Sequence, residues 1–126
     1  MSTNRPVHLN LLKIKMPVTA VMSIIHRITG TFMVLSIPIL IYLFAMSLSG
    51  EQSFKQLADM FDSTLVRFIA AVFIWFLAHH FLAGIRFLLI DIDIGVMKQT
   101  ARTSAMMVNI LGGLVLLVAL YGLVIS

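Results

Sequence analysis

Hydrophobic residues are concentrated in three long segments of the chain, and charged residues lie almost entirely outside them. The uncharged segments cover residues 28–50, 68–85 and 103–126. At a rise of about 1.5 Å per residue, a helix over any of them can cross a hydrocarbon core roughly 30 Å thick. Lipid offers the backbone no water, so each crossing segment must satisfy its own hydrogen bonds as a helix. The pattern therefore predicts three transmembrane helices.

These helices are expected at about residues 22–49, 64–90 and 103–125, in a single membrane-anchor domain that comprises residues 1–126. A polar N-terminal segment, residues 1–21, precedes them. Pro38 falls inside the first helix, where the missing N–H predicts a kink. Gly112 and Gly113 would allow close packing of the third helix. The predicted fold class is an all-α membrane protein.

The composition supports this class and excludes several kinds of chemistry. Apolar residues make up 60% of the chain and charged residues 11%, with a mean hydropathy of +1.06. There is no cysteine, so a cysteine-ligated iron–sulfur cluster, a disulfide, a thiol nucleophile and a covalently attached haem are excluded. The net charge of +4 comes from basic residues that are scattered along the chain. Such residues are better explained as signals of membrane orientation beside membrane lipid than as a surface that binds nucleic acid.

The distribution of lysine and arginine predicts the orientation in the membrane. Basic residues unaccompanied by acids lie in or next to the N-terminal segment: Arg5, Lys13, Lys15 and Arg27. The first loop, residues 51–66, has one lysine against three acids, whereas the second loop, residues 91–102, contains Lys98 and Arg102. By the positive-inside rule, the N-terminus and the second loop face the cytoplasm, and the C-terminus faces the periplasm.

Polar residues within or beside the spans are the candidates for function, because such groups are costly in lipid. Ser23, His26 and Arg27 share one helix face, since they are spaced at i, i+3 and i+4. The second helix runs in the opposite direction and ends near Arg86 and Asp91. An antiparallel hairpin therefore brings all five residues to the cytoplasmic membrane surface.

Two adjacent histidines in the second span are candidate metal ligands. His79 and His80 point about 100° apart on a helix, so they cannot both bind one metal ion. His80 shares a helical stripe with Gly84, and His79 shares one with Arg86. A glycine one turn from a histidine would let a flat macrocycle lie close to the backbone, and neutral imidazole is a usual ligand of b-type haem.

Simpler roles exist for the same residues. A histidine in a membrane helix often forms an interhelical hydrogen bond instead of binding a metal. The hydroxyls of Ser23 and Thr29 could bond to carbonyls of their own helix. Arg27 and Arg86 could extend to the membrane surface and serve only topology. The residue pattern alone thus predicts three helices with a polar pocket at the cytoplasmic face.

Two segments resemble signatures of a known family. The segments RPV at 5–7 and SIIHRITG at 23–30 are similar to the N-terminal signature of the succinate dehydrogenase cytochrome b subunits, the bacterial-type membrane anchors of respiratory complex II. The segment HFLAGIRF at 80–87, with Asp91 four residues later, resembles the second signature of that family. The resemblance extends over the whole chain, including the three spans and both loop lengths.

The resemblance implies a haem b shared between two membrane subunits. His80 matches the axial ligand of the haem iron, and a second small membrane anchor subunit supplies the other axial histidine. His79 is the alternative ligand, since it directly precedes His80. The positions near the haem propionates correspond to His26 and Arg27, with Arg86 at the same cationic face. The implied fold is a haem-containing helical bundle formed with the partner anchor.

The resemblance also implies a ubiquinone site lined by Ser23 and Arg27, with Asp91 as a nearby acid that supports it. In this arrangement a flavoprotein subunit oxidises succinate, an iron–sulfur subunit carries the electrons, and ubiquinone is reduced at the cytoplasmic surface of the bacterial inner membrane. The chain contributes the quinone site but has no catalytic domain and no catalytic residue of its own.

Three other functions compete with this one. A haem-free, quinone-binding anchor of a related fumarate reductase would share the fold and the signatures. A structural anchor without a cofactor would use both histidines in hydrogen bonds. A small membrane transporter would need an acid within a span, but every acid here lies at a helix end or in a loop.

Overall fold

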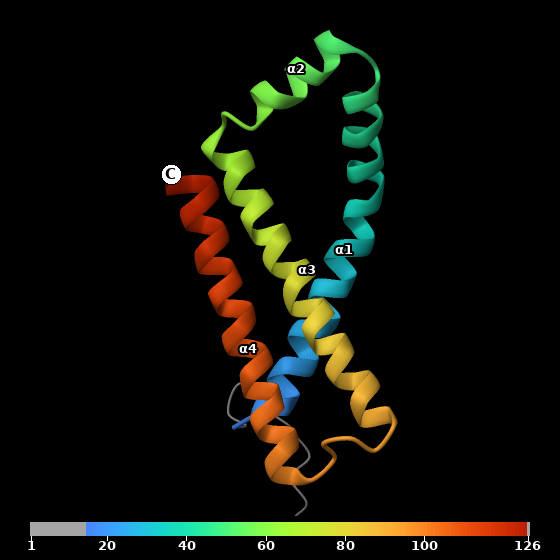
Figure 1. Cartoon of the computed structure of the whole chain (residues 1–126), viewed down its shortest axis with the longest axis vertical. Helices are drawn as coiled ribbons and strands as arrows, with labels where there is room; N and C mark the ends of the chain where they lie inside the picture. The colour runs from blue at the N-terminus through green and yellow to red at the C-terminus, as the bar shows by residue number, and fades with distance from the viewer. Residues whose placement is uncertain (1–14, 126) are drawn as a thin grey trace, which may run out of the picture.

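The computed structural model describes residues 15–125, which are almost entirely helical and contain no strand (Figure 1). The elements in chain order are α1 (Val18–Leu48), α2 (Glu51–Met60), α3 (Thr64–Asp91), α4 (Lys98–Leu120) and a final π-helical turn, η1 (Tyr121–Ile125). The RPV segment at 5–7, with Arg5, and the basic residue Lys13 lie outside the described residues. The prediction of an all-α chain is confirmed.

Three of these helices are long and apolar enough to cross a membrane, as the sequence predicts. They cover Val18–Leu48, Thr64–Asp91 and Lys98–Val124. The first begins at Val18, before the expected residue 22, and the third begins at Lys98, before the expected residue 103. Hydropathy marks the part of a helix inside the hydrocarbon, whereas the helix itself continues into the polar interface. The chain is thus a multi-pass membrane protein.

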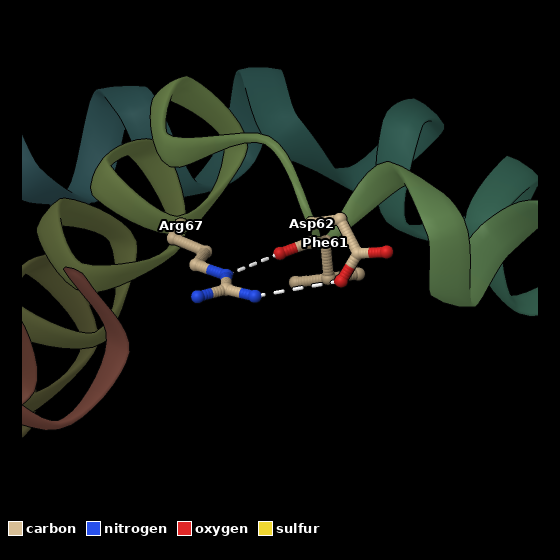
Figure 2. A network of polar contacts seen from close by, with 3 residues as sticks. All are labelled: Phe61, Asp62 and Arg67. Atoms are coloured by element: carbon tan, nitrogen blue, oxygen red, sulfur yellow. Dashed lines mark hydrogen bonds and ion pairs between the residues drawn. The ribbon is translucent and has the colours of Figure 1, made fainter. Parts of the chain in front are cut away.

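The segment between the first two spans contains a short helix, α2, where the charge pattern predicts a loop. Gly50 precedes it with a φ of 129°, a backbone conformation that residues with a Cβ rarely adopt. The turn from α2 into α3 is closed by Arg67, which donates hydrogen bonds to the carbonyl of Phe61 and to Asp62 (Figure 2). Asp62 is largely exposed, so this ion pair shapes the turn more than it stabilises the fold.

The three long helices meet through small side chains. α3 contacts both α1 and α4, and it crosses α1 near the middle of the molecule (Figure 1). α1 stays helical through Pro38, and its C-terminal half diverges from α3 (Figure 1). The buried apolar residues are Met22, Ala71, Ala83, Ala105 and Val108. In lipid, where tails are as apolar as the helices, such small residues hold helices together by close packing.

A polar pair, His79 and Asn109, also joins α3 to α4. The Nε2 atom of His79 lies 3.1 Å from Oδ1 of Asn109, and His79 is almost fully buried. Gly112 makes room for this imidazole, because a Cβ at Gly112 would come within 3.0 Å of its Cδ2. Gly113 has open space around it. One glycine of the pair therefore serves the close packing expected from the sequence.

Candidate functional site

A polar cluster lies where α1 meets α3, formed by His26 and Thr29 of α1 and by His80 of α3. The Nδ1 atom of His80 lies 3.0 Å from the carbonyl oxygen of His26 and 3.3 Å from Oγ1 of Thr29. The Thr29 hydroxyl itself donates to the same carbonyl at 2.9 Å. Three polar groups from segments about fifty residues apart thus meet within hydrogen-bonding distance of one another.

These contacts determine which nitrogen of His80 carries the proton. A backbone carbonyl can only accept a hydrogen bond, so Nδ1 of His80 must be the donor. In a neutral imidazole the Nε2 atom then has the free lone pair. No hydrogen bond to this Nε2 is found within residues 15–125. The geometry leaves His80 with the tautomer that a metal ligand needs, with its second nitrogen bonded to the backbone.

The glycine that makes room for His80 is Gly30 of α1. A Cβ at Gly30 would lie 2.7 Å from Cε1 of the imidazole, closer than any side chain could tolerate. Gly84 has a different expected role, which is to let a flat macrocycle lie close to the backbone of α3; a Cβ there would meet nothing nearer than Nε2 of His26 at 3.8 Å. The signal for Gly30 is present in the sequence, because this glycine follows His26 by one helical turn within the first signature segment.

The imidazole of His26 stacks on that of His80. The two ring centroids are 4.0 Å apart and the ring planes differ by 10°. The His26 ring also makes an edge-to-face contact with the ring of Phe87, with the two centroids 5.1 Å apart. The centroid of the Phe87 ring also lies 5.8 Å from Cζ of Arg86. Phe87 therefore contacts both the histidine cluster and Arg86, a role that the sequence alone does not identify.

The two neighbouring histidines face different helices. His80 contacts α1, whereas His79 contacts Asn109 of α4, as the 100° separation of adjacent helical residues requires. The second nitrogen of His79, Nδ1, is buried and has no partner among the described residues. No group of three or more histidine, aspartate or glutamate side chains suitable for a metal ion occurs in residues 15–125. A single imidazole from each subunit is the arrangement that the family resemblance implies.

Arg86 is a buried cation directed at α4. Its Nε donates to Oγ of Ser104 and its Nη2 to the carbonyl of Ala101, both at 2.9 Å. Only 7% of the residue is exposed. Within residues 15–125, no carboxylate lies within salt-bridge distance of its guanidinium. Neutral acceptors leave a buried positive charge uncompensated, which is costly unless an anion lies nearby.

Ser23, Arg27 and Asp91 lie at the same end of the bundle. The start of α1, the end of α3 and the start of α4 come together there (Figure 1), as expected for an antiparallel hairpin. Ser23 is half-buried, whereas Arg27 and Asp91 are exposed. Among the residues that the structure describes, their side chains form no hydrogen bond or ion pair. The structure therefore brings them to one end without joining them to each other or to His80.

An apolar groove between α1 and α3 extends from Gly30 and His80 along α1 as far as Leu40 and along α3 back to Phe73. Its volume is about 420 Å³. The lining residues are Gly30, Met33, Val34, Ile37, Leu40, Phe73, Leu77 and His80. Within this lining, the imidazole is the one polar side chain. Apolar walls with a single nitrogen donor suit a flat, hydrophobic, metal-containing ring, whereas they offer little to a hydrated ion.

The sequence matches known proteins over almost its entire length. Residues 1–124 match the family described as succinate dehydrogenase/fumarate reductase transmembrane subunit. A similar protein is the succinate dehydrogenase cytochrome b556 subunit of Coxiella burnetii (strain RSA 493 / Nine Mile phase I). The two chains are 28% identical over 120 residues, which cover 94% of this chain and 96% of the relative.

The contact between Gly30 and His80 gives a prediction about stability. Replacing a glycine inside a helix by alanine usually stabilises the helix by about 0.5–1 kcal/mol. Gly30→Ala should instead destabilise the protein by about 1–3 kcal/mol, because the added methyl meets an imidazole held by a hydrogen bond and a stack. The measurement is the thermal midpoint of the purified assembly in detergent.

The matched control is Gly113→Ala in α4, where the added methyl would meet open space. This variant should unfold at the wild-type temperature or slightly above it. Equal behaviour of the two alanine variants would show that the close approach of α1 to His80 does not constrain the fold.

Proposed function

The chain belongs to the succinate dehydrogenase/fumarate reductase transmembrane subunit family, and from this membership we propose that it is the membrane-anchoring cytochrome b subunit of a succinate:ubiquinone oxidoreductase. As a transmembrane subunit with three spans, it is part of a larger enzyme. The observation that carries the more specific proposal is the geometry of His80, whose Nδ1 is bonded to the backbone of α1.

We infer that His80 would ligate haem b through Nε2. The relative from Coxiella burnetii is named a cytochrome b556 subunit, which agrees with this role. The hydrogen bond at Nδ1, the glycine beside the ring and the apolar groove all suit such a ligand. When bound, a haem supplies one-electron redox chemistry. Within residues 15–125, His80 is the one imidazole that lines the groove, so a second histidine ligand would come from a partner subunit.

Three cationic or polar side chains are proposed to hold the haem propionates: His26, Arg27 and Arg86. Arg86 supports this proposal because its buried charge has no carboxylate partner among the described residues. Its bonds to Ser104 and Ala101 fix the guanidinium so that an anion nearby would be bound without further ordering of the side chain. His26 is held by its stack on His80.

Ser23 and Arg27 are proposed to bind ubiquinone at the same end of the bundle. The Ser23 hydroxyl would donate a hydrogen bond to a carbonyl oxygen of the quinone. Arg27 would stabilise the negative charge that develops on that oxygen as electrons arrive. Asp91 lies at this end of α3 and would support the site without contacting the quinone. Full reduction of a quinone takes up two electrons and two protons.

The assembly we propose contains a second small membrane anchor, an iron–sulfur subunit and a flavoprotein subunit, in the inner membrane of a bacterium. Large apolar side chains are exposed along all the spans and would contact lipid or the second anchor. Lys98 and Arg102 begin α4 at the end where α1 starts, whereas the acidic helix α2 lies at the other end (Figure 1). By the positive-inside rule the first of these ends is cytoplasmic.

The competing functions find less support. A transporter would need a titratable acid within a span, but the acids of the described chain lie in α2, in the connecting segments or at the last residue of α3. A haem-free anchor would leave His80 as a simple interhelical hydrogen-bonding residue. That role explains the bond of Nδ1 to His26 but leaves Nε2 of His80 without a hydrogen-bond partner among the described residues.

The proposed ligand is tested by absorbance spectra of membranes that contain the assembled complex, recorded as reduced minus oxidised. His80→Ala should abolish the b-type signal, because no other side-chain nitrogen within residues 15–125 lines the groove. The matched variant His79→Ala should keep the signal, since its imidazole faces α4. Loss of the signal in His79→Ala alone would move the ligand by one residue. Absence of any b-type signal in the wild type would leave a haem-free anchor.

The quinone site is tested by Arg27→Ala. Succinate-driven reduction of ubiquinone should fall by tenfold or more, on the order of what loss of one charge-stabilising donor costs. Succinate oxidation by an artificial dye that accepts electrons before the membrane domain should remain at the wild-type rate. Thr31→Ala, on the same exposed part of α1, serves as the control. Wild-type quinone reduction by the arginine variant would exclude the proposed role of Arg27.

A further inference from the structure

We propose that Thr29 is a positioning residue for His80, and that its hydroxyl increases the electron density at the metal-binding nitrogen of that imidazole. This inference rests on the proposed function, because it assigns a second residue to the proposed haem ligand. Thr29 does not reach the haem site itself; it acts through His80.

Thr29 differs from the other hydroxyl residues of α1. The hydroxyls of Thr31, Ser36 and Ser47 each donate to a carbonyl of their own helix, and no contact with another helix accompanies these bonds in the described chain. Thr29 also donates to its own helix, at the carbonyl of His26, but its oxygen lies 3.3 Å from Nδ1 of His80 as well. Thr29 is fully buried, so this hydroxyl has no access to water.

The direction of the hydrogen bonds follows from the donors and acceptors. The proton of the Thr29 hydroxyl is used at the His26 carbonyl, so its oxygen can only accept from His80. The Nδ1–H of His80 is therefore shared between two acceptors, with the carbonyl at 3.0 Å as the stronger one and the hydroxyl at 3.3 Å as the weaker. The β-branched side chain of threonine has few rotamers in a helix, which keeps the hydroxyl in place.

Two adjacent residues of α1 thus have separate roles toward the same ring. Gly30 sets how close the imidazole lies to α1, since any Cβ there would collide with it. Thr29, together with the His26 carbonyl, sets the rotation of the ring by holding Nδ1. Acceptors at Nδ1–H also make Nε2 a stronger donor to a metal. A stronger donor stabilises the oxidised metal and lowers its reduction potential.

The test compares Thr29→Val with Thr29→Ser in the complete complex in membranes. Valine keeps the shape of threonine but removes the oxygen, whereas serine keeps the oxygen and removes a methyl group. The measurement is the midpoint potential of the b-type absorbance in a redox titration. We expect Thr29→Val to shift the potential in the positive direction and Thr29→Ser to stay near the wild-type value. The control Thr31→Val removes an exposed hydroxyl from the same helix and should cause no shift.

The outcomes separate this inference from the function on which it rests. A wild-type b-type signal whose potential is the same in Thr29→Val overturns the role of Thr29 alone, as does an equal shift in the valine and serine variants. If Thr29→Val does not assemble, Thr29→Ala replaces it in the comparison with Thr29→Ser under the same criteria. A wild-type complex without any b-type signal overturns both the inference and the proposed haem ligand.

Discussion

The close approach of α1 to α3 at Gly30 is the constraint on which the candidate site depends. A membrane interior offers little hydrophobic force between helices, so helices associate where small residues let their backbones meet. At this crossing the missing side chain of Gly30 admits the ring of His80, and the carbonyl oxygen of His26 accepts a hydrogen bond from its Nδ1–H. Packing and chemistry therefore use the same contact, and a larger residue at this position would disturb both.

α3 connects this site to the rest of the bundle because its adjacent histidines face opposite neighbours. His79 bonds to Asn109 and rests on Gly112 of α4, while His80 bonds to α1. The rotation of α3 about its axis is thus held from both sides, since turning one imidazole away from its partner would also turn the other. Nearly two turns further along α3, Arg86 adds two more hydrogen bonds to α4.

Hydropathy and charge were sufficient to predict the three spans, the antiparallel hairpin and the end of the bundle at which Ser23 and Arg27 lie. They did not predict α2, because a ten-residue amphipathic segment between spans resembles a polar loop. The spacing of residues along one helix also could not identify Gly30 as the partner of His80. That contact depends on the crossing point of two helices, and the sequence alone does not specify where they cross. For the same reason it could not direct Arg86 toward Ser104.

The central claim is that His80, held at Nδ1 by α1, ligates a haem through Nε2. An electron cryomicroscopy map of the complete complex in lipid nanodiscs tests it most directly. The account predicts density for a haem whose iron lies at bonding distance from Nε2 of His80, with Gly30 against the ring and His79 on Asn109. A haem ligated by His79, or a complex in which His80 contacts protein atoms alone, would contradict it.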